Sequence, residues 1–266
     1  MIHINQIRGF VRRLAPTLYL ESKSLDPKAM ILAKRLCPNN YGRSLVLSEF
    51  IANISSTFSR TSKLNVAVIG GSSTEPEILV LAEMGFIFES TMFGIEENTQ
   101  YLDLNQPPQN YSFADFDLVL CSQVWEHIWH HGNAFENIKN LMSSGSYLWL
   151  AAPASNRAHS SPDYFCAGFT SSYFSNNLKF IGFSVLATGQ LGSVRNYRAT
   201  HSLPIWLSVR SHNQPLLNTF SGSNILARFV ITLRYLLRNI ELYFFSRRVS
   251  DDISFATESW VFAKKK

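Results

Sequence analysis

From Leu64 onward, short apolar segments alternate with segments of helical character, and this alternation constrains the fold more than any other feature. Runs of β-branched and other apolar residues predict five strands, at 64–69, 86–88, 100–104, 116–121 and 145–152. Pro76 lies in the first turn of a predicted helix that Ser73 or Thr74 caps, and a second helix is predicted at about 124–142. Strands that alternate with helices form a parallel sheet covered on both faces, which predicts an α/β, doubly wound fold.

The rest of the chain adds helices before this sheet and two strands after it. Residues 1–63 contain two or three predicted helices, one of which starts at Asp26 and Pro27. Further strands are predicted at 183–187 and 260–263. We therefore expect a mostly parallel, seven-stranded sheet, and four segments along the chain: an N-terminal helical cap at 1–63, a core at 64–199, an insertion at 200–255 and a closing strand at 256–266.

Composition limits the class of protein. With 46% apolar and 16% charged residues, the chain is typical of folded proteins rather than disordered ones. Its three cysteines, Cys37, Cys121 and Cys166, are widely spaced, which argues against a disulfide framework or a cysteine zinc site and favours a cytoplasmic location. No apolar run long enough for a signal peptide follows the N-terminal arginines, and no uncharged apolar run of about 18 residues occurs, so neither a signal peptide nor a transmembrane helix is expected.

Charge is distributed unevenly along the sequence. Residues 1–63 have a net charge of +7, residues 64–155 of −10 and residues 156–266 of +8, within a total of +5. An acidic centre between basic ends suggests a cationic ligand at the centre and an anionic ligand at the flanks. The alternative is that these charges serve solubility alone.

Ligands of a doubly wound sheet bind beyond the carboxyl ends of its strands. Gly70, Gly71 and Ser72 follow the first strand; glycines there admit a ligand close to the backbone, and the next helix start offers N–H groups to an anion. Glu89 is predicted to end the second strand, 18 residues after Gly71, near the spacing at which an acid binds ribose hydroxyls. Alternatively, Glu89 is a surface residue of a loop.

Two segments carry a resemblance to a known family. Residues 116–128 run Phe-Asp-Leu-Val-Leu-Cys-Ser-Gln-Val-Trp-Glu-His-Ile, and residues 137–153 run from a predicted helix through a Ser-Gly-Ser turn into a strand ending in proline. They resemble the fourth-strand motif of class I S-adenosylmethionine-dependent methyltransferases (approximately Phe-Asp-Leu-Val, then Leu-Glu-His-Val) and the segment that follows it. Leu102-Asp103-Leu104 is similar to the third-strand motif of that family, and Trp260-Val-Phe-Ala-Lys to its closing strand.

The resemblance implies a Rossmann-like methyltransferase whose cofactor is S-adenosyl-L-methionine, the methyl donor. It implies that Asp103 contacts the adenine and Glu89 the ribose, and that the donor-binding residues are Gly70, Gly71, Ser72, Glu89, Asp103, Leu104, Ser122 and Gln123. His127 follows the fourth strand, where we expect it to act as a general base oriented by Glu126. The alternative is a histidine hydrogen-bonded for structure.

The sequence departs from the family's pattern at the first motif. Val68 stands where an acid usually precedes the first glycine, and Glu75 or Glu77 is the candidate to replace that acid. Gln123, Glu126 and His127 are similar to the Glu-x-x-Glu-His of metal-dependent small-RNA 2′-O-methyltransferases, with a neutral glutamine for the first acid. Because one helix face rarely supplies enough ligands, no metal is predicted.

Methyl transfer from a sulfonium is an in-line displacement, in which the protein mainly positions the reactants and a base helps only if the acceptor must lose a proton. We expect as acceptor a hydroxyl of a small molecule or glycan, anionic in view of the basic flanks. Arg195 and Arg198 are candidate contacts for its anionic group or, alternatively, solvated surface residues. A nucleic acid is not expected, because no recognition motif appears. Two alternatives remain open: a non-catalytic methyltransferase-like binding module, and a nicotinamide-dependent oxidoreductase, for which Gly-x-Gly-x-x-Gly is missing.

One segment of the insertion is amphipathic. In residues 225–245, most apolar side chains fall on one broad face of a helix, and Arg228, Arg234 and Arg238 fall on the other. Such a helix packs on its own domain or, alternatively, serves as a lid, a dimer contact or a peripheral contact with an anionic membrane. The sequence gives no indication of the oligomeric state.

Overall fold

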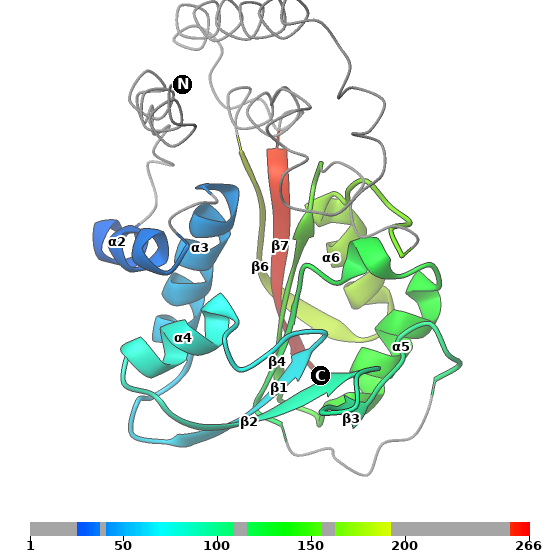
Figure 1. Cartoon of the computed structure of the whole chain (residues 1–266), viewed down its shortest axis with the longest axis horizontal. Helices are drawn as coiled ribbons and strands as arrows, with labels where there is room; N and C mark the ends of the chain where they lie inside the picture. Colours follow the sequence, from blue (N-terminus) through cyan, green and yellow to red (C-terminus); the bar gives the residue numbers. More distant parts are fainter. Residues whose placement is uncertain (1–25, 38–40, 109–115, 156–162, 193–255) are drawn as a thin grey trace, which may run out of the picture. The chain divides into compact units, whose positions relative to one another are not determined.

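The computed structural model describes residues 26–37, 41–108, 116–155, 163–192 and 256–266. They contain a seven-stranded sheet with the strand order β3-β2-β1-β4-β5-β7-β6 (Figure 1). The strands are β1 (Lys63–Ile69), β2 (Ile87–Gly94), β3 (Gln100–Tyr101), β4 (Leu118–Ser122), β5 (Tyr147–Pro153), β6 (Phe183–Gly192) and β7 (Ala256–Lys265). Within it β7 runs antiparallel to both its neighbours, while the other pairs are parallel. The predicted doubly wound, mostly parallel sheet is confirmed.

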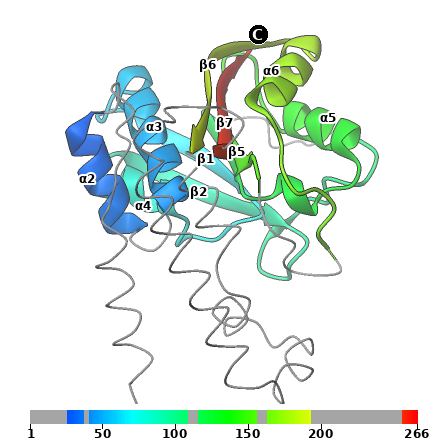
Figure 2. The same cartoon turned by 90° about the horizontal axis from the view of Figure 1, so that it is seen from above.

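Helices cover both faces of this sheet (Figures 1 and 2). On one face, α2 (Pro27–Leu36), α3 (Tyr41–Thr57) and α4 (Pro76–Glu83) share a hydrophobic cluster with β1, β4, β5 and β7. On the other, α5 (His131–Leu141) and α6 (Ser171–Phe180) pack on the opposite sides of the same strands. The central strands are buried on both faces because successive side chains alternate between these two clusters.

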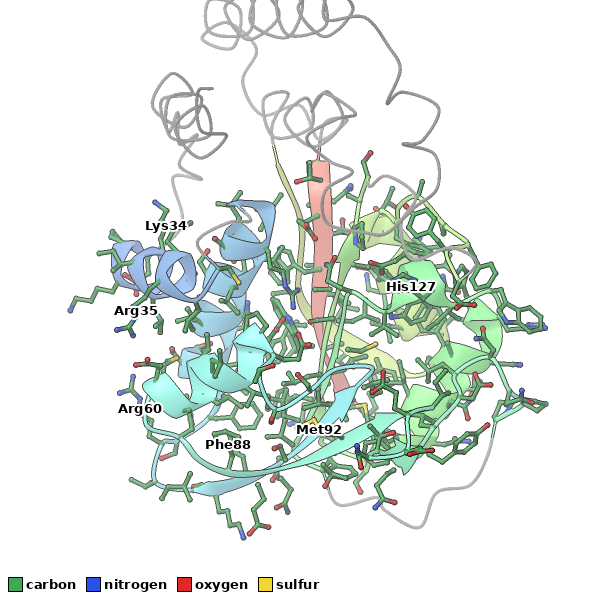
Figure 3. The ribbon with its side chains drawn as sticks, viewed as in Figure 1. Lys34, Arg35, Arg60, Phe88, Met92 and His127 are labelled. Carbon is green, nitrogen blue, oxygen red and sulfur yellow. The ribbon has the colours of Figure 1, made fainter. Side chains whose placement is uncertain are left out.

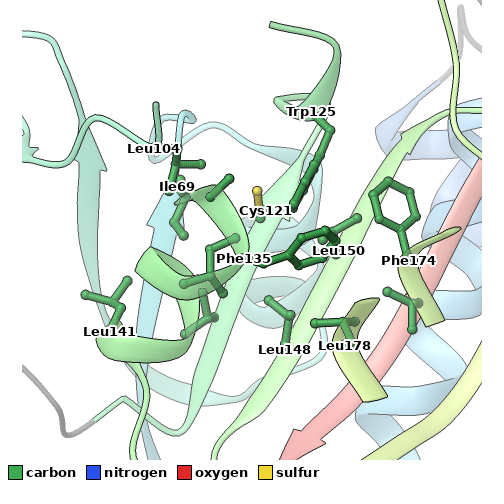
Figure 4. Packing of buried hydrophobic residues seen from close by; sticks show 14 of the residues in the cluster. Ile69, Leu104, Cys121, Trp125, Phe135, Leu141, Leu148, Leu150, Phe174 and Leu178 are labelled. Carbon is green, nitrogen blue, oxygen red and sulfur yellow. The ribbon is translucent and has the colours of Figure 1, made fainter. Parts of the chain in front are cut away.

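The predicted helix at 124–142 is wrong as one continuous element. A short 3₁₀ helix, η1 (Trp125–His127), is followed by extended backbone at Ile128 and only then by α5. The Asn105 side-chain oxygen accepts hydrogen bonds from the amides of Trp129 and His130, at 2.9 and 3.1 Å, which holds those amides outside a helix. Figure 4 shows the result inside the core, where Trp125 packs beside Cys121 and Phe174.

The second strand is longer than predicted. It continues past Glu89 to Gly94, because β1 offers a pairing partner at every position up to Ile69, which lies opposite Phe93. The helix after β1 also starts differently. Glu75, rather than Ser73 or Thr74, occupies the N-cap of α4, and its side chain makes no capping bond.

The N-terminal helices are packed into the main core. Asp26 caps α2 as predicted, accepting a hydrogen bond from the Lys28 amide at 2.9 Å. In α3, the ring of Phe50 lies 5.2 Å from that of Trp149 in β5. The bounds of the four segments stay a prediction, and the insertion at 200–255 lies outside the described residues. Among the helices that the structure describes, none has the length and apolarity to span a membrane.

Candidate functional site

The loop after β1 requires glycine at two consecutive positions. Gly70 has a φ of 67°, and its amide donates to the carbonyl of Phe93 at 2.8 Å. A Cβ atom at Gly70 would lie 2.7 Å from a methyl group of Val124, and one at Gly71 would lie 2.7 Å from Cγ of Glu75. The loop therefore passes close to the residues after β4 and before α4. Ser72 is exposed beyond it.

Asp103 and Leu104 lie in the segment that follows β3, next to the end of β2. The amide of Leu102 donates to the carbonyl of Gly94 at 2.8 Å, which ties the two segments together. The Asp103 carboxylate accepts from the Asn105 amide at 2.9 Å and from the Gln106 side chain at 3.2 Å, so its orientation is held locally. Leu104 is buried in the core below.

Glu89 does not lie at this edge of the sheet, so its predicted position is wrong. It pairs with Asn65 in register, whereas the carboxyl end of β1 is opposite Phe93. Its carboxylate is exposed and lies 2.6 Å from Nζ of Lys63, at the amino end of β1. The first acids after β2 are Glu96 and Glu97, which the prediction of a short strand missed.

Ser122 ends β4 and Gln123 follows it, and both side chains take part in partly buried polar contacts. The Ser122 hydroxyl donates to Oε1 of Glu77 at 2.7 Å, and the Gln123 amide donates to Oε2 of Glu258 at 3.0 Å. Gln123 has a φ of 58°, a left-handed conformation that is uncommon for a residue other than glycine. Such conformations concentrate at functional sites, where the surrounding structure enforces them.

A buried ion pair between Arg43 and Glu77 adjoins Ser122. Nη2 of Arg43 in α3 lies 2.9 Å from Oε2 of Glu77 in α4 and 4.0 Å from Glu75. Burial raises the pKa of Glu258 to about 7, although Arg43 and the hydrogen bond from Gln123 act in the opposite direction. Sequence reasoning named Glu77 as a replacement acid but missed Arg43 and Glu258; a charged residue inside an apolar helix or strand pattern is the signal that could have found them.

His127 and Glu126 follow directly after this group, in η1. His127 Nδ1 lies 2.5 Å from the carbonyl oxygen of Asp163, and its Nε2 lies 3.9 Å from Oε1 of Glu126. A carbonyl can only accept, so this contact places a proton on Nδ1 and, in the neutral ring, the lone pair on Nε2. Glu126 is buried, and its carbonyl accepts from the amides of Phe165 and Cys166. The carbonyl of Asp163 thus lies closer to the ring than the carboxylate of Glu126 does, and an orienting role for Glu126 stays a prediction.

The other histidines of this segment face elsewhere. The ring of His130 packs against exposed Trp129, and His131 packs against Trp125 and Phe169 in the core, where burial lowers its pKa. Figure 3 shows His127 on the side of the sheet that α5 covers. Within the described ranges, no group of three or more His, Cys, Asp or Glu residues is arranged to hold a metal ion.

Of the predicted site residues that the structure describes, all except Glu89 lie at the carboxyl ends of parallel strands or in the segments that follow them, whereas Arg195 and Arg198 lie outside the described residues. Comparison with known proteins identifies the fold. No protein-family model and no curated protein matches the sequence. Among solved structures, a protein of Galdieria sulphuraria described as a sarcosine dimethylglycine methyltransferase matches with a TM-score of 0.50 at 12% identity, over 84% of this chain and 86% of that one. The chain has the Rossmann-like methyltransferase fold.

Two further solved structures have similar coverage. The [4+2]-cyclase SpnF matches with a TM-score of 0.49 at 11% identity, over 89% of this chain and 93% of its own. Coclaurine N-methyltransferase, bound to N-methylheliamine and SAH, matches with a TM-score of 0.47 at 13% identity, over 98% of this chain and 88% of its own.

Proposed function

We propose that this protein is a methyltransferase that takes its methyl group from S-adenosyl-L-methionine and transfers it by in-line displacement. One observation carries the proposal. Three features lie together at the carboxyl ends of the strands of a methyltransferase fold: the tight glycine loop, the Asp103 segment and the left-handed Gln123. When bound, the donor supplies a methyl group already activated by its sulfonium. The task left to the protein is to bind, orient and exclude water.

The residues at this edge fit such a donor. Gly70 is exposed after the carboxyl end of β1 and Gly71 is partly exposed, which suits the amino-acid end of the donor, and Asp103 suits the adenine. For the ribose hydroxyls we now propose Glu96 in place of Glu89, because Glu96 is the first acid beyond the carboxyl end of β2. Ser122 and Gln123 border the loop from β4.

His127 is proposed as the general base for an acceptor hydroxyl. The carbonyl of Asp163 holds the ring in the tautomer that carries the lone pair on Nε2, the form a base requires. We propose a small molecule or glycan, anionic in character, as the acceptor. Arg195, Arg198 and residues 225–245, from which acceptor or membrane contacts were expected, lie outside the described residues.

The first prediction tests the donor. Calorimetric titration should detect binding of S-adenosylmethionine and no binding of NAD. Asp103→Ala should weaken donor binding by about 1–3 kcal/mol, since the adenine of the bound donor loses its hydrogen bond to Asp103. Preference for the dinucleotide would favour the oxidoreductase instead, and binding of neither ligand would leave a non-catalytic module.

The second prediction tests the base. With the acceptor found by screening hydroxyl compounds against a labelled methyl donor, His127→Ala should slow turnover about 10²–10⁴-fold at saturating donor. His130→Ala, which alters an exposed ring on the same segment, is the matched control and should leave the rate unchanged. A near wild-type rate for His127→Ala would mean that positioning alone supports the reaction.

A further inference from the structure

Polar contacts link the N-terminal helix α3 to the carboxyl end of β4. Arg43, near the start of α3, donates from Nη2 to Oε2 of Glu77 at 2.9 Å, and Oε1 of Glu77 accepts from the Ser122 hydroxyl at 2.7 Å. The side chains of Arg43 and Glu77 are 8% and 1% exposed. Solvent and salt therefore screen this ion pair much less than a surface pair.

The Glu77 carboxylate lies at the start of α4, next to the glycine loop. Glu75, two residues earlier, packs so closely on Gly71 that a Cβ atom there would come within 2.7 Å of Glu75 Cγ. On the other side of the carboxylate, Ser122 leads into the left-handed Gln123. Because a protein interior is close-packed, a shift of Glu77 would displace both segments that border the loop.

The positive charge of Arg43 also interacts with the carboxyl groups of Glu77, Glu258 and Glu75. Burial by itself would lower the pKa of Arg43, but Glu77, Glu258 and Glu75, with the thiol of Cys37, raise it. Arg43 therefore stays charged. Loss of one partner from a buried ion pair leaves the other uncompensated, so the carboxylates would rearrange or bind protons.

We propose that Arg43 is a positioning residue for the methyl donor: through Glu77 it holds Ser122 and the loop at 70–75 in the geometry that donor binding requires. The proposal rests on the proposed function, because it takes S-adenosylmethionine as the ligand of this loop. It makes α3, which precedes the whole sheet in the sequence, a contributor to the donor site.

The experiment compares two arginines that differ in burial. Arg35 in α2 forms an ion pair of the same length, 2.9 Å, with Glu83, but both side chains are exposed (Figure 3 labels Arg35). Calorimetric titration of S-adenosylmethionine into Arg43→Met should give a Kd about tenfold weaker than wild type, as expected for neighbours in one network. Arg35→Met should bind the donor like wild type, and Arg43→Lys should recover part of the affinity.

A double-mutant cycle separates positioning from a merely structural role. In the Glu77→Gln background, Ser122 keeps an acceptor, so adding Arg43→Met should change the Kd less than twofold. The double variant replaces a buried ion pair by neutral groups, which proteins often tolerate, so it keeps the test available if Arg43→Met alone does not fold. In that case Arg43→Lys supplies the comparison in the wild-type background.

Each outcome decides between the two proposals. If the wild type fails to bind the donor, the proposed function falls and this inference with it. If the wild type binds and Arg43→Met lowers only the melting temperature, with an unchanged Kd, Arg43 is structural and the positioning proposal alone is overturned. The same holds if Arg43→Met weakens binding equally in both backgrounds.

Discussion

At the scale of single residues, the candidate site contains buried ionisable side chains, among them Arg43, Glu77 and Glu258. Glu258 lies at the start of β7 with its carboxylate buried beside Gln123, and it faces Arg43 as well as the acids Glu77 and Glu126. Burial disfavours the ionised form more than Arg43 and the hydrogen bond favour it, so the pKa rises from 4.5 to about 7. The folded protein thus holds a proton that the unfolded chain releases at lower pH.

The third prediction follows from this difference. Between pH 4.5 and 7 the folded state binds more protons than the unfolded state, so this carboxyl makes the free energy of unfolding fall as pH rises, by at most about 3 kcal/mol. Glu258→Gln keeps an acceptor for Gln123 and removes the titration. Urea unfolding should show the variant about 1–3 kcal/mol more stable than wild type at pH 8 and nearly equal to it at pH 5.

An exposed acid provides the control. Glu83→Gln, which removes a carboxylate paired with Arg35 at the surface, should show no such dependence on pH. A Glu258→Gln variant less stable than wild type at pH 8 would mean that the attraction of Arg43 outweighs the cost of burial.

At the scale of secondary-structure elements, the length of β2 decides which acid can reach the site. The pairing with β1 carries the strand from Ile87 to Gly94, so Glu89 lies in its first half and Glu96 beyond its carboxyl end. Gly94 lies five steps along the strand from Glu89, a span of about 16 Å. A carboxylate side chain does not bridge that distance.

The fourth prediction compares these two acids. Glu96→Gln should weaken binding of S-adenosylmethionine about tenfold, since a neutral amide replaces the charged acceptor of the ribose hydroxyls and one of its two oxygens becomes a donor group, and Glu89→Gln should leave it unchanged. Both carboxylates are exposed, so neither change should affect folding. Calorimetry at one pH measures the Kd of the donor for both variants. Weaker binding by Glu89→Gln than by Glu96→Gln would contradict the assignment of Glu96.

At the scale of the whole molecule, the helices of residues 27–57 and the sheet share one hydrophobic core. Phe50 is fully buried against Trp149, which in turn stacks on Trp260 at 5.2 Å. These three residues come from α3, β5 and β7, which are far apart in the sequence. A core of this kind predicts that the helices and the sheet unfold together.

The fifth prediction tests that cooperativity. Phe50→Ala should lower the free energy of unfolding by about 3–5 kcal/mol, the range for deleting a buried aromatic ring. Tryptophan fluorescence and far-ultraviolet circular dichroism should report one coincident transition in urea. Phe180→Ala, which removes an 89% exposed ring from α6, is the control and should change stability little. Two separate transitions would instead support an independent N-terminal cap.

The sequence by itself determined the fold class and predicted the strand ends at which the candidate site lies. Hydrophobic periodicity and turn residues act locally, so the alternation of strands and helices, the cap at Asp26 and the glycines after β1 could all be predicted from neighbouring residues. The resemblance of residues 116–128 to a known motif likewise placed Gln123, Glu126 and His127 at one end of β4.

Only the tertiary structure decided the contacts between distant segments. Pairing with β1 set the end of β2 and so placed Glu89 away from the carboxyl end of the strand, and the Asn105 side chain interrupted the helix expected at 124–142. Arg43 and Glu77 lie 34 residues apart, and Gln123 and Glu258 lie 135 apart. No local pattern encodes such pairs, because burial of a charge is stable only where the folded chain brings its partner to it.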